Sequence, residues 1–258
     1  MYRRLTWSKD WDELKFLQQL LHNPRNRILP EAKHRIFAFW TGDNPMSENR
    51  KHALRTFLEY PEIPFVLVTP KNLQEYILQD HPLPKEFKFL SNVHKSDYLR
   101  CYFMYYYGGG YCDIKPIRNS WKSAFEILNA NNDKDGLGYT EIPTGVGYVY
   151  EDDEHLPERL YNLNYEMQCN YKKLIGNCAY IFKPGSLIFE ILLDEQERRI
   201  FNFREELLKY PGNILGNNYG YPLRWTYILG EIFHPLVYKQ HNRIIFNDSI
   251  KPIFSDYR

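Results

Sequence analysis

The sequence predicts an α/β fold, a single domain in which a mainly parallel sheet is flanked by helices. Short apolar segments such as 35–40 and 65–68 are typical of buried strands, and a helical pattern follows each of them. The length of 258 residues suits one large domain, 1–258. Ligands of such sheets bind at the carboxyl ends of the strands, which is where we expect a site.

Capping and chain-breaking residues set the bounds of the predicted elements. Ser47 suits an N-cap, Thr69-Pro70 the start of a helix and Pro211-Gly212 a stop, while the acidic run at 151–154 predicts a solvated loop. The predicted helices are 11–21, 47–58, 69–78, 95–107, 121–128, 187–208 and 225–233. The predicted strands are 35–40, 65–68, 111–115, 138–142, 178–182 and 243–246.

Composition and spacing argue against several classes of function. Basic residues number 33 and acidic residues 32, so nucleic-acid binding through bulk positive charge is not expected. The four cysteines lack C-x-x-C spacing and the eight histidines lack H-x-x-x-H spacing, which argues against zinc sites. Neither a P-loop nor a G-x-G-x-x-G fingerprint occurs, which argues against kinases and dehydrogenases.

Aromatic residues make up 17% of the chain, with 22 tyrosines. Grooves that bind sugars or bases use such rings, although ordinary packing is the commoner role of any single Tyr. The opening residues lack the apolar region of a signal peptide, and no stretch is long enough to span a bilayer. We therefore expect a cytoplasmic protein, in which exposed aromatics and the basic stretch 239–243 form either a peripheral membrane contact or a solvated surface.

The segment 96–116 joins a polar pair on a helix to an acidic strand end. Asp97 and Arg100 lie three residues apart and off the apolar stripe of the predicted helix, so they share a face. They point either at a common ligand or at each other, as an intrahelical ion pair. Gly108–Gly110 end the helix by allowing positive φ, and they lead into a strand on which Asp113 and Lys115 face the same side.

Trp40 stands at the end of the first predicted strand, before a Thr-Gly-Asp turn. A transferase that acts on a nucleotide-linked sugar needs an aromatic face for the base and carboxylates for the sugar hydroxyls. It also needs a metal or fixed cations for the departing diphosphate. The position of Trp40 suits the first task, and the alternative is a core Trp that closes the sheet.

The order Ser-Asp-x-x-Arg, an aromatic stretch and Gly-Gly-x-Tyr-x-Asp resembles the sugar-binding region of DXD-containing GT-A glycosyltransferases. That group includes Golgi mannosyltransferases, capsular polysaccharide synthesis enzymes and large glucosylating toxins. The resemblance covers residues 96–116 and is weaker at 39–42 and 176–185. It implies a GT-A-like, Rossmann-related fold with a nucleotide-sugar-binding half at about 31–120 and an acceptor-side half at about 121–258.

The same resemblance implies roles for individual residues. Trp40 would stack on the base, Asp97 would meet ribose or donor-sugar hydroxyls, and Arg100 would lie near the donor sugar. Asp113 matches the first Asp of the DXD motif. The implied catalytic residues are Asp97, Arg100, Asp113 and Lys115, and the implied donor-binding residues are Trp40, Thr41, Tyr111 and Asn177.

Lys115 departs from the family pattern, which has a second acidic residue there to ligate Mn²⁺ or Mg²⁺. An ammonium group cannot coordinate a cation. Either Asp113 holds the metal with later residues, or the metal is dispensed with and Lys115 supplies positive charge to the diphosphate. Candidate additional metal ligands are Glu231, His234 and Asp248, and candidate additional cations are Arg118 and Arg224.

The resemblance implies transfer of a sugar from a UDP- or GDP-linked donor to a glycan or glycolipid acceptor. The product would be lipopolysaccharide, capsule or a related surface polysaccharide. The resembled families are mostly retaining and need no general base, and Glu141 is the candidate base if the enzyme inverts. The alternative that Lys115 suggests is a non-catalytic nucleotide- or carbohydrate-binding module with a degenerate DXD motif.

Overall fold

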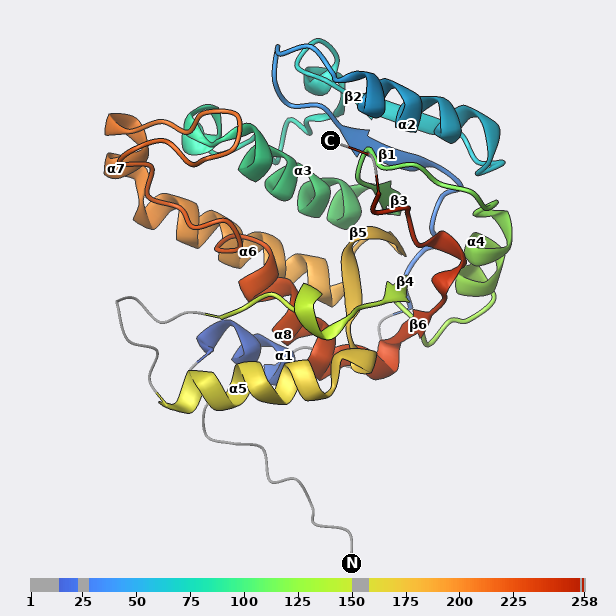
Figure 1. Ribbon diagram of the computed structural model, residues 1–258. Coiled ribbons are helices and arrows are strands. Elements are labelled where there is room, and N and C mark those ends of the chain that lie inside the picture. Colours follow the sequence, from blue (N-terminus) through green and yellow to red (C-terminus); the bar gives the residue numbers. More distant parts are fainter. Residues whose placement is uncertain (1–13, 23–27, 150–157, 256, 258) are drawn as a thin grey trace, which may run out of the picture.

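A six-stranded sheet with the strand order β2-β1-β3-β5-β4-β6 forms the centre of the fold (Figure 1). The computed structural model describes residues 14–22, 28–149, 158–255 and 257. The strands are β1 Ile36–Phe39, β2 Phe65–Val68, β3 Gly109–Cys112, β4 Gly136–Thr140, β5 Ile175–Phe182 and β6 Ile244–Phe246. Within these residues only β5 runs antiparallel to its neighbours. The predicted α/β class is confirmed, and the sheet is mixed.

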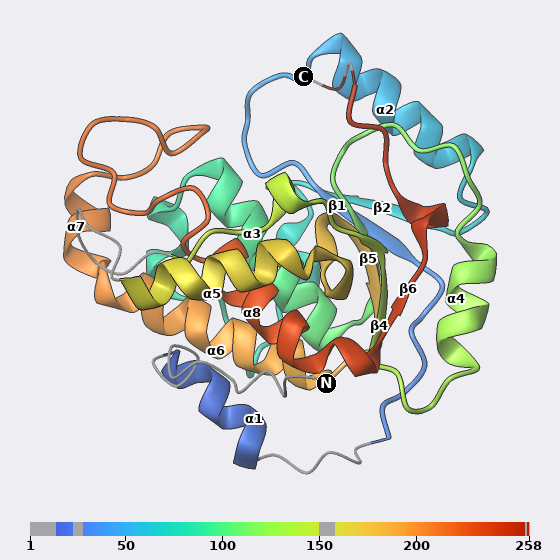
Figure 2. The ribbon, with the colours of Figure 1, turned by 60° about the horizontal axis from the view of Figure 1, so that its bottom comes forward.

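Helices cover both faces of this sheet (Figures 1 and 2). They are α1 Gln19–His22, α2 Glu48–Glu59, α3 Asn92–Tyr106, α4 Lys122–Asn129, α5 Glu158–Cys169, α6 Leu187–Asn202, α7 Arg204–Lys209 and α8 Gly230–Gln240. The larger apolar core joins α3, α6 and α8 to one face. A second core joins α4 and the end of α2 to the other face. Strands from both halves of the chain therefore share one sheet and its two cores.

The centre of the sheet is built from continuous apolar runs, as expected for parallel strands that are covered on both faces. All four residues of β1 are buried, and β1 lies between β2 and β3. Phe37 and Phe39 both pack edge-on against Phe103 of α3, with ring centroids 4.9 and 5.0 Å apart. These contacts fix α3 against β1.

Local signals define α2 and α3. The Ser47 hydroxyl accepts a hydrogen bond from the Arg50 N–H, which confirms the predicted N-cap of α2. The α3 helix begins three residues earlier than predicted, because Ser91 caps it by accepting from the His94 N–H at 3.1 Å. At its other end Gly108 and Gly109 have φ of 59° and 96°, which confirms that glycine allows the sharp turn into β3.

Three predicted helices differ from the structure. At 69–78 there is only a 3₁₀ turn, Leu73–Tyr76, because the Thr69 N–H donates to the Asn72 side chain and the chain then folds back in a β-bridge. The predicted 187–208 helix is broken at Phe203, which leaves the helical region of φ and ψ. The predicted 225–233 helix begins only at Gly230, after turns closed by the Thr226 carbonyl.

The predicted 111–115 strand ends at Cys112. The Asp113 N–H still donates to the Cys178 carbonyl of β5, but the Lys115 N–H turns back to the Asp113 carbonyl at 2.6 Å. Asp113 and Lys115 therefore belong to a tight turn beyond the strand, not to the strand itself.

Two predictions fall on residues that the structure does not describe. They are the start of the 11–21 helix and the acidic run at 151–154. Elsewhere in the described ranges, no helix combines the length and the apolar character that a membrane crossing requires.

Replacing Gly109 by alanine should strongly destabilise the protein. A Cβ at this φ of 96° would lie 2.8 Å from the Arg35 carbonyl oxygen, so backbone strain and a backbone clash coincide. We expect Gly109→Ala to lower the free energy of unfolding by at least about 2 kcal/mol, measured by urea denaturation. Gly230→Ala is the control, since its Cβ would make only ordinary contacts at 3.4 Å and beyond. Equal stability of the two variants would contradict the strained turn.

Candidate functional site

Four of the predicted site residues meet at the carboxyl end of β3. We call Asp97, Arg100, Asp113 and Lys115 the charged cluster. The Arg100 Nη2 atom lies 3.0 Å from Asp97 Oδ1 and 3.5 Å from Asp113 Oδ1. The Lys115 ammonium contacts the other oxygen of Asp113. The intrahelical ion pair of Asp97 with Arg100 is thus formed, and it is one part of a larger network.

Tyr111 contacts two members of the charged cluster from the side of the core. Its hydroxyl donates to Asp113, and the Arg100 guanidinium carbon lies 4.5 Å from the centroid of its ring. Tyr111 is only 1% exposed, so its ring faces Arg100 and the core. In this structure Tyr111, which we expected to bind the donor, positions two members of the charged cluster.

The start of β5 completes one side of the charged cluster. The Asn177 carbonyl accepts a hydrogen bond from Arg100 Nη1 at 2.9 Å. The Cys178 sulfur lies 3.2 Å from the Lys115 Nζ atom. Because β5 runs antiparallel to β3, its first residues lie beside the last residues of β3. Asn177, for which the resemblance implies donor binding, therefore adjoins the charged cluster, and Cys178 is an addition that the sequence did not indicate.

Access to the cluster differs sharply among its members. Asp97, Arg100 and Lys115 are 5–7% exposed, whereas the Asp113 side chain is 21% exposed. Asp113 is therefore the carboxylate of the charged cluster that a ligand can reach. Asp97 influences Asp113 through Arg100, which contacts both carboxylates.

Burial and pairing set the charges of the two carboxyl groups. Burial raises the pKa of Asp97 to about 6, reinforced by Asp113 and opposed by Arg100. Burial also disfavours ionisation of Asp113, but Lys115 and Arg100 outweigh it and hold the pKa of Asp113 well below its usual range. Asp113 in turn keeps the pKa of Lys115 above its ordinary value despite burial. At neutral pH the charged cluster contains two cations and two carboxylates.

Trp40 and Thr41 lie at the carboxyl end of β1, the strand next to β3. Trp40 is half-buried, its indole N–H donates to the Asn44 carbonyl at 2.8 Å, and its ring packs on the small cluster that contains Ile114. Ile114 stands between Asp113 and Lys115 in the chain. The Thr41 hydroxyl donates to the Asn92 carbonyl at the start of α3 at 2.6 Å. The Trp40 indole therefore lies beside the loop that carries Asp113 and Lys115, the DXD-like residues.

The residues present do not fit a Mn²⁺ or Mg²⁺ site. Both oxygens of the Asp113 carboxylate already face cationic groups, and a divalent ion there would be repelled by Lys115 and Arg100. Across the described residues, no group of three or more His, Cys, Asp and Glu side chains is arranged to hold a metal. The donor set thus favours a site whose positive charge comes from side chains.

The other proposed metal ligands and cations are engaged elsewhere. Glu231 binds Arg224 and the Thr226 hydroxyl, and Asp248 accepts from the Thr140 N–H. Arg118 is exposed at the surface. The fully buried His234 accepts a hydrogen bond from the Gly147 N–H through Nδ1, and burial lowers its pKa to about 4.

Glu141 reaches the cluster only indirectly. Its carboxylate accepts from the Ile142 N–H at 2.8 Å and lies 3.9 Å from His234, which in turn lies 3.3 Å from the Asn177 amide. Glu141 is 8% exposed, and burial raises its pKa. Its surroundings are those of a carboxyl group held in the fold.

Two further residues adjoin the cluster that the sequence did not indicate. Arg50 of α2 donates through Nη1 to the Ile114 carbonyl. The ring centroid of Tyr257, near the end of the chain, lies 4.7 Å from the Lys115 Nζ atom. Local sequence gives no sign of either contact, because each depends on where the packed fold places distant segments.

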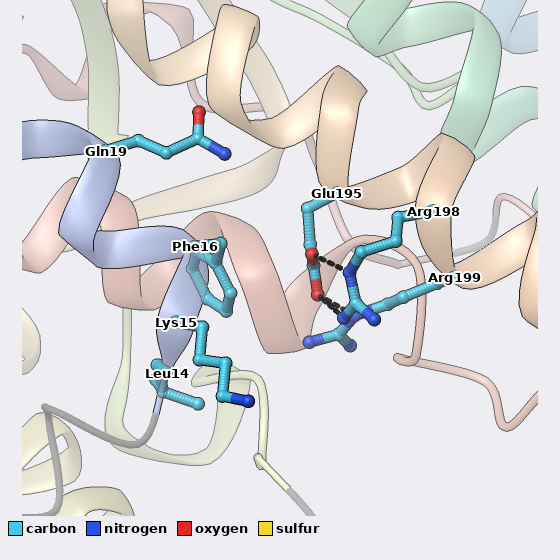
Figure 3. A pocket seen from close by; sticks show the side chains of 7 residues that line it. All are labelled: Leu14, Lys15, Phe16, Gln19, Glu195, Arg198 and Arg199. Carbon is cyan, nitrogen blue, oxygen red and sulfur yellow. Dashed lines mark hydrogen bonds and ion pairs between the residues drawn. The ribbon is translucent and has the colours of Figure 1, made fainter.

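A pocket of about 460 Å³ lies between the 3₁₀ turn Lys15–Gln18, the start of α1 and α6 (Figure 3). It is lined by Leu14, Lys15, Phe16, Gln19, Glu195, Arg198 and Arg199. The Glu195 carboxylate binds both arginines at 2.6–2.7 Å. No predicted site residue lines this pocket, and its ion pairs lie within α6.

No protein-family profile and no curated protein matches the chain. Its functional interpretation therefore depends on the geometry of the charged cluster and its surroundings.

The raised pKa of Asp97 should appear in the pH dependence of stability. Between about pH 4 and pH 6 the unfolded chain releases this proton while the folded chain retains it, so this group makes the fold less stable as the pH rises. The Asp97→Asn variant has no carboxyl group at this position, so it does not lose stability in this way as the pH rises. We expect the stability of Asp97→Asn relative to wild type to rise by about 2–3 kcal/mol between pH 4 and pH 7, measured by urea denaturation.

Titration of the buried histidines affects the stability of both proteins alike, so it cancels in the difference between Asp97→Asn and wild type. Asp133→Asn is the matched control, since the Asp133 side chain is 71% exposed and Lys134 lowers its pKa. Its effect on stability should stay constant between pH 5 and pH 7, because Asp133 is ionised in both the folded and the unfolded chain over that range. A pH-independent difference for Asp97→Asn would contradict the raised pKa.

Proposed function

We propose that this protein is a glycosyltransferase that moves a sugar from a UDP- or GDP-linked donor to a glycan or glycolipid acceptor. One observation carries the proposal. A helix and a loop beyond a strand bring the charged cluster together at the carboxyl edge of the parallel strands, beside a half-buried indole. That edge is where sheets of this class bind nucleotides.

The parts of a nucleotide sugar find matching groups along this edge. Trp40 offers an aromatic face to the base, and such stacking contributes roughly 1–3 kcal/mol. Asp113, the accessible carboxylate, accepts hydrogen bonds from hydroxyls of the donor sugar. Asp97 is a positioning residue, since it is buried and acts by holding Arg100. These assignments agree with the resemblance of residues 96–116 to DXD-containing GT-A enzymes.

The reaction needs positive charge where the diphosphate departs. The bond between the anomeric carbon and the β-phosphate oxygen breaks, its electron pair stays on the phosphate, and the acceptor oxygen forms the new bond. In a retaining reaction the acceptor proton passes to the departing phosphate oxygen. Lys115 and Arg100 are fixed cations in a partly desolvated site, where they stabilise the developing charge more than they would in water.

The acceptor class comes from the resemblance of residues 96–116 to the DXD-containing GT-A enzymes. A surface polysaccharide such as lipopolysaccharide or capsule follows from the resemblance alone. We place the acceptor on the side of the site formed by residues 121–258. A cytoplasmic enzyme in peripheral contact with the membrane would meet both its soluble donor and a lipid-linked acceptor.

A second candidate function is a binding module without catalysis. The observation that favours it is the pairing of Asp113 with Lys115 and Arg100, which occupies the one accessible carboxylate. The two functions differ in a simple assay. A glycosyltransferase incubated with UDP-glucose, UDP-galactose or GDP-mannose releases nucleoside diphosphate slowly by transfer to water, and a pure binder releases none.

Removing the charge of Asp113 should abolish this release. We expect Asp113→Asn to reduce the rate at least about 100-fold, because the accessible carboxylate and the anchor of Lys115 are lost together. Asp133→Asn is the matched control, since Asp133 is 71% exposed and pairs only with Lys134 among the described residues. Nucleoside diphosphate is quantified by chromatography and folding by thermal denaturation. An unchanged rate in folded Asp113→Asn would reject the assignment of Asp113.

If side-chain cations take the place of a metal ion, the reaction rate should not depend on free divalent ions, and a chelator should have little effect on it. We expect EDTA to change the rate of wild type less than about twofold, and Lys115→Ala to reduce it at least about 100-fold. The assay is repeated with added Mn²⁺ and Mg²⁺. Loss of all activity in EDTA, restored by either ion, would show that a metal performs this task.

A further inference from the structure

Helix α2 places a third cation over the loop that carries the DXD-like residues. Arg50 donates through Nη1 to the carbonyl of Ile114, the residue between Asp113 and Lys115. Arg50 stands one turn before Ala53, which is fully buried and belongs to the same small apolar cluster as Ile114. Packing of α2 on this cluster therefore fixes the guanidinium beside the loop.

Among the residues that the structure describes, no carboxylate pairs with the Arg50 guanidinium. Lys115 and Arg100 are balanced by Asp113 and Asp97, whereas no described carboxylate lies within ion-pair distance of Arg50. Its contacts are the Ile114 carbonyl and an aromatic ring. Arg50 and the charged cluster together contain three cations and two carboxylates at neutral pH. A guanidinium has five N–H donors, so groups remain to bind an anion.

Arg50 and Lys115 converge on one side chain. The ring centroid of Tyr257 lies 4.9 Å from the Arg50 Cζ atom and 4.7 Å from the Lys115 Nζ atom. The Ile253 N–H donates to the Pro116 carbonyl at 2.8 Å, which ties the C-terminal segment to the same loop. Figure 2 shows this segment running from β6 toward α2. The Arg50 Cζ and Lys115 Nζ atoms therefore lie less than about 10 Å apart, around one ring.

We propose that Arg50 and Lys115 together bind the diphosphate of the nucleotide, an inference that deepens the proposed function and rests on it. The contacts of the loop support it. A nucleotide sugar carries its diphosphate between the base and the sugar. Arg50 contacts the loop that bears Asp113 and Lys115, and Trp40 packs on the apolar cluster that contains Ile114 of the same loop. A guanidinium binds phosphate oxygens in pairs and an ammonium binds them as a point charge, so the two cations suit two linked phosphates.

The test is calorimetric titration of UDP, GDP and inorganic pyrophosphate into the full chain in buffer with EDTA. Arg50→Gln removes the charge but retains a donor for the Ile114 carbonyl, and Arg50→Ala removes both. Arg55→Ala is the matched control, because Arg55 is exposed on the same helix. We expect both Arg50 variants to weaken binding of the better nucleoside diphosphate by about 10- to 100-fold, and Arg55→Ala to leave it unchanged. The matching nucleoside, uridine or guanosine, should bind wild type and Arg50→Gln equally.

The outcomes separate this inference from the proposed function. Equal affinity of wild type and folded Arg50→Gln for the nucleoside diphosphate would overturn the role of Arg50 while leaving the transferase proposal in place. Binding that appears only with Mn²⁺ would overturn the two-cation site in the same way. If wild type binds no nucleoside diphosphate with or without Mn²⁺, both proposals fail. Thermal denaturation of each variant shows whether lost binding reflects lost folding.

Discussion

The buried guanidinium of Arg100 is the constraint on which the site depends. It joins Asp97 of its own helix, Asp113 beyond β3 and the Asn177 carbonyl of β5, and it lies over the Tyr111 ring. A charge this deeply buried is tolerated only where carboxylates and carbonyls surround it. Removing one partner of such a network typically costs about 3–5 kcal/mol. The interaction that arranges the cluster therefore also fixes α3 against the sheet.

The topology of the sheet makes this arrangement possible. Two positive-φ glycines return the chain from α3 into β3 almost at once, so the helix and the strand that bear the acidic residues are adjacent in space. The opposite direction of β5 then brings its first residues, Asn177 and Cys178, to the carboxyl end of β3. A parallel strand in that place would present its last residues instead. The antiparallel direction of β5 is thus the reason that this strand contributes to the site.

Local patterns predicted much of this, and long-range contacts explain what they missed. The apolar run of β2, the Ser47 cap and the glycine turn are local signals, and the structure confirms all three. The three-residue spacing of Asp97 and Arg100 correctly placed both on one face. The Thr69-Pro70 start signal predicted a helix at 69–78. It gave no sign that a side-chain hydrogen bond and a β-bridge would take the place of that helix. Contacts of Arg50 likewise depend on how α2 packs across a loop more than sixty residues away, which no local pattern encodes.

Lys115 stands where the resembled family has an acidic residue, yet this difference changes the net charge of the site little. Two carboxylates with a divalent ion carry no net charge, and neither does Asp113 paired with Lys115, so one ammonium replaces an acid and an ion together. The replacement has a limit, however, because Asp113 balances the charge of Lys115, so the pair by itself carries no net positive charge toward a phosphate. A diphosphate needs an excess of positive charge. Under the proposal that excess lies on Arg50, which pairs with no carboxylate among the described residues and whose position follows from the packing of α2 and not from the DXD-like segment itself.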